Sequence, residues 1–149
     1  MIKNIRMPSS GMLRDIYYEF FHVTFLFPDD TDGILLLTAK DAANEWSDWV
    51  EITDGSTTLS SKLTTSDGHI TYLIVETVSA NDKVYIVELA YGDDKTIVGR
   101  ARFYGGSVPK QSQKMYSDVI PAGETVYYRM KCEQASGTAE AHLRYHLHT

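Results

Sequence analysis

The chain has 149 residues, a hydrophobic fraction of 43% and a formal net charge of −6 at pH 7. This length predicts one domain that buries enough surface to fold without cross-links, and the single cysteine, Cys132, excludes an internal disulfide. The acidic balance argues against a nucleic-acid partner, which requires a basic face. No apolar run is long enough for a transmembrane helix and the amino terminus lacks the apolar core of a secretory signal, so we expect no membrane partner and folding in a cytoplasm.

The first part of the chain predicts an arm followed by an aromatic strand. Residues 1–14 carry Pro8 and Gly11 and little core material, so we expect an extended arm, either loose or paired with a neighbouring subunit. A single β-sandwich domain would then span residues 15–149. Residues 16–27 are densely aromatic and apolar in both alternation phases, which predicts a strand that is buried on two sides or lies in a subunit contact. Within it, Phe21 is the candidate contact residue.

An acidic turn follows this strand. Asp29, Asp30 and Asp32 lie between Pro28 and Gly33, a composition typical of a loop. Their spacing does not match a calcium-binding EF-hand, because proline stands where the first ligand should be. We therefore predict no metal at this loop.

Two tryptophans mark the next segment. After a short strand at 34–38 and a helical turn or loop at 39–45, residues 46–52 alternate as a strand does. We expect one tryptophan in the core and the other near the surface. Trp46 and Trp49 are candidates for packing or a subunit contact, and in a second interpretation they form a platform that stacks on a sugar ring.

The middle of the chain predicts central strands. Residues 70–75 and 83–91 are apolar in both phases, which is typical of strands with neighbours on either side. A further strand at 96–104 places Arg100 and Arg102 on one outer face. We expect the remaining segments to be a hydroxyl-rich loop or weak edge strand at 54–68 and a polar connection at 108–118.

The last 25 residues alternate strictly in two segments, 125–132 and 138–148. Between them Ser136-Gly137 supplies a turn, with glycine expected to take the positive φ, so we predict a long antiparallel hairpin. The predicted core side chains are Tyr128, Met130, Leu143, Tyr145 and Leu147. The predicted outer side chains form one basic face: Arg129, Lys131, His142 and Arg144. This face is either solvated and balanced by Glu140, or it docks on an acidic partner surface.

Turns at short intervals between about eight or nine strands, with no long helix, predict an all-β fold. The architecture we expect is an antiparallel β-sandwich of jelly-roll type with an extended N-terminal arm. An α/β fold is disfavoured because no amphipathic helices alternate with the strands.

We find no motif that carries catalytic chemistry. The sequence lacks a nucleophile elbow, a phosphate-binding loop, a zinc-binding His-Glu-x-x-His and paired cysteines. His146 and His148 lie two residues apart on the last strand, close enough to share a metal, but no third ligand is evident near them in the sequence. We therefore predict a non-enzyme with no metal and no other cofactor.

A family resemblance gives the first indication of function. The run VIPAGETVYYRMK from Val119 to Lys131, followed by SGTAEAHL from Ser136 to Leu143, resembles the carboxy-terminal part of small β-sandwich virion proteins of tailed bacteriophages. A Pro-x-Gly turn, a strand carrying an arginine, a small-residue turn and a last alternating strand carry this resemblance, which extends over about half of the chain. It implies a capsid decoration or cement subunit, or a neck, tail or fibre component, commonly in threefold assemblies.

Two hypotheses follow. The first is a virion structural protein, foremost a capsid decoration protein, that forms a homo-oligomer, foremost a trimer, and binds a major capsid protein or another virion protein. It would be made in the host cytoplasm and located in the virion. The second is a carbohydrate-binding jelly roll that uses Trp46 or Trp49, with the acidic loop at Asp29–Asp32, in a receptor-binding or tail-fibre role.

Overall fold

In the computed structural model, residues 24–106 and 111–148 are described. The predicted arm at 1–14, Phe21 and most of the predicted aromatic strand therefore lie outside the described residues. Within the described ranges the structure contains nine strands and one short 3-10 helix, η1 (Leu59–Lys62). The strands are β1 (Thr24–Phe27), β2 (Leu35–Thr38), β3 (Val50–Glu51), β4 (Asp67–Val78), β5 (Lys83–Tyr91), β6 (Thr96–Gly105), β7 (Gln111–Lys114), β8 (Val126–Cys132) and β9 (Thr138–His148). No helix in these ranges has the length and apolar character needed to cross a membrane.

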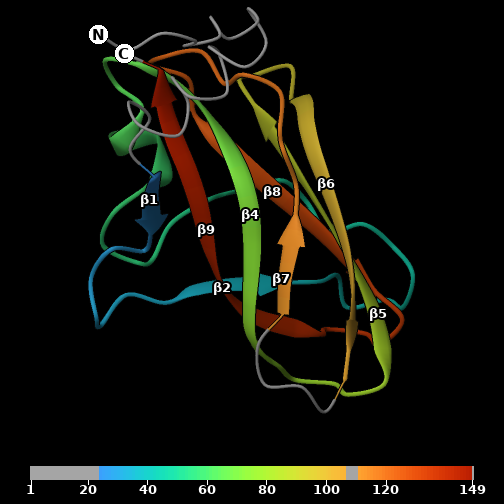
Figure 1. Cartoon of the computed structure of the whole chain (residues 1–149). Helices are drawn as coiled ribbons and strands as arrows, with labels where there is room; N and C mark the ends of the chain where they lie inside the picture. Colours follow the sequence, from blue (N-terminus) through green and yellow to red (C-terminus); the bar gives the residue numbers. More distant parts are fainter. Residues whose placement is uncertain (1–23, 107–110, 149) are drawn as a thin grey trace, which may run out of the picture.

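The strands form two antiparallel sheets packed face to face. Sheet A has the order β1-β9-β4-β7, with β2 also paired to β9, and sheet B has the order β3-β8-β5-β6. Figure 1 shows β9, β4 and β7 side by side, with β8, β5 and β6 in the second layer. The pairs are nested along the chain: β1 and β2 with β9, β3 with β8, β4 with β7, and β5 with β6. This is one long hairpin rolled into two layers, and it confirms the predicted antiparallel sandwich of jelly-roll type.

The predicted hairpin of the last two strands is wrong. β8 pairs with β3 and β5 in sheet B, whereas β9 pairs with β1, β2 and β4 in sheet A. Residues 133–137 therefore cross from one layer to the other. Alternation identifies the apolar side of a strand but not its partner. Two consecutive strands of a sandwich can present apolar sides to the same core from opposite sheets, and these two strands do so.

The turn chemistry of this crossing also differs from the prediction. Ser136, rather than Gly137, takes the positive φ, at 57°. Gly137 is buried, and a Cβ atom added to it would lie 2.9 Å from the Sγ atom of Cys132. Glycine is therefore needed here because the backbone approaches a neighbouring side chain closely, not because of its dihedral freedom.

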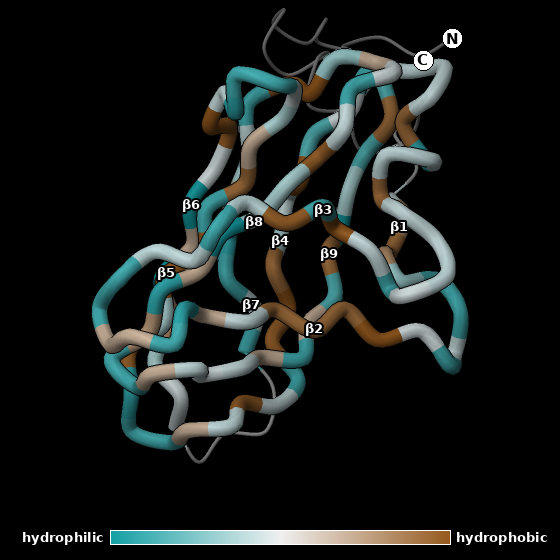
Figure 2. Tube along the Cα trace, turned by 180° about the vertical axis from the view of Figure 1, so that it is seen from behind, coloured by the Kyte–Doolittle hydropathy of each residue, from teal (hydrophilic) through white to brown (hydrophobic). Residues whose placement is uncertain are grey.

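The inner faces of the two sheets meet in one hydrophobic core. The predicted core residues Tyr128, Met130, Leu143 and Tyr145 are buried, and Leu147 packs partly buried against them. Figure 2 shows hydrophobic stretches along β2, β4 and β9, while many of the peripheral loops are hydrophilic. The hydroxyl of Tyr128 accepts a hydrogen bond from the backbone N–H of Thr38 at 3.1 Å, which links β8 to β2 across the layers.

The predicted central strands are confirmed, since β4 lies between β9 and β7, and β5 lies between β8 and β6. Residues 39–45, expected as a helical turn or a loop, form a loop. Two other expectations at the periphery need correction. Only the pair Val50–Glu51 of the expected strand at 46–52 is formed, and the connection expected at 108–118 contains β7. Short irregular edge segments carry little apolar alternation, so the sequence pattern does not resolve them.

Candidate functional site

The outer face of sheet B is partly covered by the loop between β2 and β3. This loop runs along the free edge of β8, where the N–H of Asn44 donates to the carbonyl of Cys132 at 2.8 Å and that of Ser47 donates to the carbonyl of Met130 at 3.0 Å. The Ser47 hydroxyl accepts from the N–H of Met130 at 3.0 Å. These bonds satisfy the edge of β8 and hold the neighbouring tryptophan rings beside its outward side chains.

A buried carboxylate lies at the centre of this face. Glu88 on β5 points outward, because its neighbours Val87 and Leu89 point into the core, yet its side chain is only 2% exposed. Arg129 on β8 donates to Glu88 Oε1 from Nε at 3.2 Å and from Nη2 at 2.9 Å. Arg100 on β6 donates to Oε2 from Nη2 at 3.1 Å. These three charge-assisted hydrogen bonds compensate the burial of the carboxylate, and we call Arg129, Glu88 and Arg100 the Glu88 row.

The two tryptophans complete the cover over this row. The Cζ atom of Arg129 lies 4.5 Å from the ring centroid of Trp46 and 4.6 Å from that of Trp49. The Nζ atom of Lys131 lies 4.7 Å from the centroid of Trp46. Both indoles are half-buried, so neither is in the core, and the expectation of one core tryptophan is wrong. Cation–π attraction explains why the rings lie on the sheet surface over Arg129 instead of inside the sandwich.

A second row of side chains lies beside the first on the same three strands. Ile86 on β5 is in register with Lys131 on β8 and with Arg102 on β6, and we call these three residues the Ile86 row. Among the residues that the structure describes, neither Arg102 nor Lys131 forms an ion pair. The Ile86 row thus has two cations and no carboxylate, whereas the Glu88 row has two cations around one.

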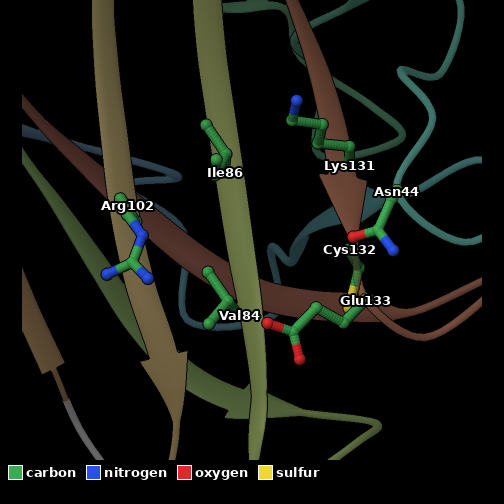
Figure 3. A pocket seen from close by; sticks show the side chains of 7 residues that line it. All are labelled: Asn44, Val84, Ile86, Arg102, Lys131, Cys132 and Glu133. Atoms are coloured by element: carbon green, nitrogen blue, oxygen red, sulfur yellow. The ribbon is translucent and has the colours of Figure 1, made fainter.

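A pocket of about 250 Å³ opens on this second row. Figure 3 shows Val84 and Ile86 of β5 between Arg102 on one side and Lys131 on the other. The complete lining is Asn44, Val84, Ile86, Arg102, Lys131, Cys132 and Glu133. The pocket therefore has an apolar floor, two cations on opposite sides of β5 and the carboxylate of Glu133 at the end beside Val84.

On the β6 side of Val84, across β5 from Glu133, a tyrosine hydroxyl is hydrogen-bonded to a carboxylate. Tyr104 lies opposite Val84 on β6, and its hydroxyl donates to Asp82 Oδ1 at 3.2 Å. Desolvation raises the pKa of Tyr104, and the Asp82 carboxylate raises it further. This tyrosine therefore stays protonated at neutral pH and adds no charge to the pocket.

The single basic face expected for Arg129, Lys131, His142 and Arg144 does not exist. His142 and Arg144 extend from β9 on the outer face of sheet A, on the opposite side of the sandwich from Arg129 and Lys131. There His142 Nδ1 lies 3.0 Å from Glu76 Oε1, and Arg144 Cζ lies 5.5 Å from the ring centroid of Tyr72. The error follows from the mistaken hairpin, because strands in opposite layers expose opposite faces.

Sheet A also brings together histidines that are distant in the sequence. His69 on β4 is in register with His146, and its Nδ1 atom lies 2.6 Å from Nε2 of His148. Sequence reasoning missed His69 as a neighbour of the other two because the contact depends on the pairing of β4 with β9. Among the described residues, however, no group of three or more histidine, cysteine, aspartate or glutamate side chains is placed to hold a metal ion.

The acidic loop after β1 is held by local contacts. Lys62 Nζ lies 3.1 Å from Asp29 Oδ2, and the N–H of Asp32 donates to Asp30 Oδ1 at 3.2 Å. These contacts explain the aspartates as part of the loop structure and its link to η1.

The sequence analysis also missed Glu88, Asn44 and Ile86 as parts of the outer face of sheet B. A signal for Glu88 was present: it is the one charged residue in the interior of an otherwise apolar strand, and the Gly92 turn places Arg100 opposite it. A carboxylate at such a position requires a cationic partner. The sequence does not indicate that Asn44 lies on this face, because its position depends on the irregular course of the loop along β8.

Comparisons with known proteins give no family. No protein-family model matches the chain, and no curated protein matches its sequence. Among solved structures, the chain is similar to that of the infectious bursal disease virus Gx strain, with a TM-score of 0.42, 12% identity and 86% of this chain covered. It is also similar to that of the Gt strain, with a TM-score of 0.41, 8% identity and 87% covered, and to the infectious bursal disease virus VP2 subviral particle, with a TM-score of 0.40, 10% identity and 87% covered. The match covers only 32%, 32% and 33% of those chains, respectively, so this chain spans about a third of their length.

Proposed function

We propose that the chain is a non-enzymatic virion structural protein, foremost a capsid decoration protein, that docks through the outer face of sheet B on an acidic surface of a capsid protein. The observation that carries this proposal is that Arg102 and Lys131, without ion-pair partners among the described residues, share one face with Trp46 and Trp49 in a protein with net charge −6, and that Lys131 lies against the Trp46 ring. Such a face attracts an acidic surface and orients it.

The composition of the face favours a protein partner. Arginine, tryptophan and tyrosine are enriched at the energetically important centres of protein interfaces. A nucleic acid would meet a protein that is acidic overall and a small cationic area, which together give weak phosphate binding. Among the described residues the face offers no exposed nucleophile with an adjacent base. The Glu88 oxygens already accept three hydrogen bonds from arginines. Cys132 lines the pocket but is only 2% exposed, and the other polar groups of the lining are cations, an amide and Glu133.

The virion role is supported by the sequence resemblance and agrees with the fold. Jelly rolls are common in viral capsid proteins, but they are common in lectins too, so the architecture alone does not choose between the two hypotheses. The tryptophan geometry weighs against the sugar platform. Arg129 already stacks on both Trp46 and Trp49, and a sugar ring would have to compete with it for the indole surfaces.

The proposal includes self-association, foremost as a trimer. Phe25, Leu26 and Leu36 on β1 and β2 are 38%, 44% and 48% exposed, respectively. Apolar side chains gathered at one edge of a sheet suit a subunit contact. Light scattering of the full chain should give a mass above that of one subunit, and a monomer at high concentration would refute this part of the proposal.

The docking proposal is tested on capsids of the virus that encodes the chain, prepared without this protein. Co-sedimentation should show saturable binding that weakens as salt increases, because exposed charges are screened. Arg102→Glu should weaken binding by about tenfold or more, whereas the matched control Arg144→Glu on the opposite face should leave it unchanged. Absence of binding by the parent protein, or equal losses for the two variants, would refute docking through sheet B. Binding to a glycan screen instead would favour the carbohydrate hypothesis.

A further inference from the structure

The Glu88 row and the Ile86 row on the outer face of sheet B have the same arrangement of cations, but only the Glu88 row contains an anion between them. Both are built on β8, β5 and β6, in that order across the sheet. In the Glu88 row the central residue supplies a carboxylate that Arg129 and Arg100 hold from the two sides. In the Ile86 row the central residue is apolar, and Lys131 and Arg102 stand at the corresponding flanking positions. The second row therefore has the cations of the first without its anion.

The spacing of the strands allows both cations to reach one group. Neighbouring strands lie about 4.8 Å apart, so β8 and β6 are separated by about 10 Å with β5 between them. Arg129 and Arg100 span this separation by meeting at one carboxylate. Lys131 and Arg102 have side chains of similar length on the same two strands, so a carboxylate above Ile86 is within their common reach.

The pocket over the Ile86 row has the size of a side-chain site. Its volume is about 250 Å³, below the range of roughly 300–1,000 Å³ that is typical of sites for small-molecule ligands. The floor of Val84 and Ile86 suits the methylene groups of an acidic side chain, and Asn44 adds an amide to the lining. Glu133 at the end beside Val84 disfavours a second anion there, so the pocket is selective for one carboxylate.

The geometry points to a binding site for one aspartate or glutamate side chain of a partner protein, seated above Ile86 between the Arg102 guanidinium and the Lys131 ammonium. The partner carboxylate takes the place in the Ile86 row that Glu88 has in the neighbouring row. This inference rests on the proposed function, because it names the chemistry that the docking face recognises. The Trp46 ring, 4.7 Å from Lys131 Nζ, keeps the lysine beside the pocket and reduces the entropy lost on binding.

The decisive variant supplies the missing carboxylate from within the chain. Ile86→Glu should place a glutamate between Lys131 and Arg102, as Glu88 is placed between Arg129 and Arg100, and should thereby occupy the site. We expect the variant to fold and to bind capsids about tenfold or more weakly. The matched control Ile86→Gln has the same shape without the charge and should lose clearly less affinity. Equal binding by the parent and Ile86→Glu, or equal losses for both variants, would overturn the inference.

A second measurement is independent of the capsid. An NMR titration with a capped hexaglutamate peptide should shift the side-chain signals of Arg102 and Lys131, and a capped hexaglutamine peptide should not. Ile86→Glu should abolish the shifts, and Arg144→Glu should leave them unchanged. Shifts spread evenly over all exposed cations, or shifts that persist in Ile86→Glu, would overturn the inference. A parent protein that shows the local shifts but binds no capsid would support the carboxylate site and refute the proposed function, so the two failures are distinguishable.

Discussion

β8 and β9 have nearly the same sequence pattern and very different surroundings. Both alternate apolar and polar residues, and both bury their apolar sides in the same core from opposite sheets. On β8, Arg129 is 25% exposed and holds a buried glutamate beneath two tryptophans. On β9, Arg144 is exposed and lies over the ring of Tyr72. The inward sides are thus equivalent, whereas the outward sides are not.

The difference arises from the neighbours of each strand rather than from the strand itself. β9 has strands on both of its edges, β1 and β2 on one side and β4 on the other. One edge of β8 is completed by the two residues of β3 and by the loop that carries Asn44 and Ser47. That loop brings the tryptophans over the sheet. An alternating strand therefore acquires a structured outer face where an irregular segment covers its edge.

The largest expected effect is on the free energy of unfolding, and it tests whether the inward sides of β8 and β9 are equally buried. Leu143→Asp on β9 and Met130→Asp on β8 each place a carboxylate in a core position that is 1% or 0% exposed, respectively. We expect each to lower the free energy of unfolding by about 4 kcal/mol or more, because an unpaired charge loses its hydration. Urea denaturation gives the measurement, and Arg144→Asp on the outer side of β9 is the control with a small effect. A Leu143→Asp variant as stable as the parent would show that β9 has another register.

The next largest effect on stability tests whether the outward side chains of β8 and β9 differ in their surroundings. Arg129→Met removes the better-buried partner of Glu88 and leaves the carboxylate with Arg100, whose side chain is 63% exposed. We expect a loss of about 3 kcal/mol, as for other broken buried pairs. Arg144→Met should cost less than about 1 kcal/mol, the range of an exposed cation–π contact. Equal losses for the two variants in urea denaturation would remove the distinction between the faces.

These two strands also show what the sequence can predict. Their alternation identified Tyr128, Met130, Leu143 and Tyr145 as core residues, because the side-chain period of a strand is a local property. It could not identify the sheet to which each strand belongs, since pairing depends on residues far away in the chain. The predicted basic face failed for this reason, although each of its residues was correctly expected to point outward.

The candidate site was predictable in part. Arg129, Lys131, Trp46 and Trp49 were all identified as candidates, but in two separate hypotheses, and the structure joins them on one face. The reason is physical: the tryptophans reach the sheet through backbone hydrogen bonds of an irregular loop, which leave no periodic trace in the sequence. The placement of Arg102 and Lys131 on either side of Ile86 becomes apparent only when the register across three strands is known.

The crossing between β8 and β9 gives a third prediction, of intermediate size. Gly137→Ala would place a methyl group 2.9 Å from Cys132 Sγ, and we expect it to cost about 1–3 kcal/mol, as overpacking does. Ser136→Gly should be neutral or stabilise by up to about 1 kcal/mol, because Ser136 has a φ of 57° that glycine adopts without strain. Thermal or urea unfolding of both variants gives the comparison. The opposite order of stability would support a turn with Gly137 in the left-handed region.

The smallest expected effect concerns the ion pair on the outer side of β9. His142 Nδ1 and Glu76 Oε1 are 3.0 Å apart, and their side chains are 30% and 31% exposed, respectively. A double-mutant cycle with His142→Gln and Glu76→Gln isolates this pair from the other contacts of the two residues. Because solvent screens the charges, we expect a coupling of at most about 0.5 kcal/mol.

The same cycle on Arg129→Met and Glu88→Gln should give at least about 1.5 kcal/mol, since Glu88 is buried and accepts two of its hydrogen bonds from Arg129. A large coupling between His142 and Glu76 would mean that the outer face of sheet A is as well covered as that of sheet B. A small coupling between Arg129 and Glu88 would mean that water reaches the carboxylate. Either result would make β8 and β9 alike on their outward sides.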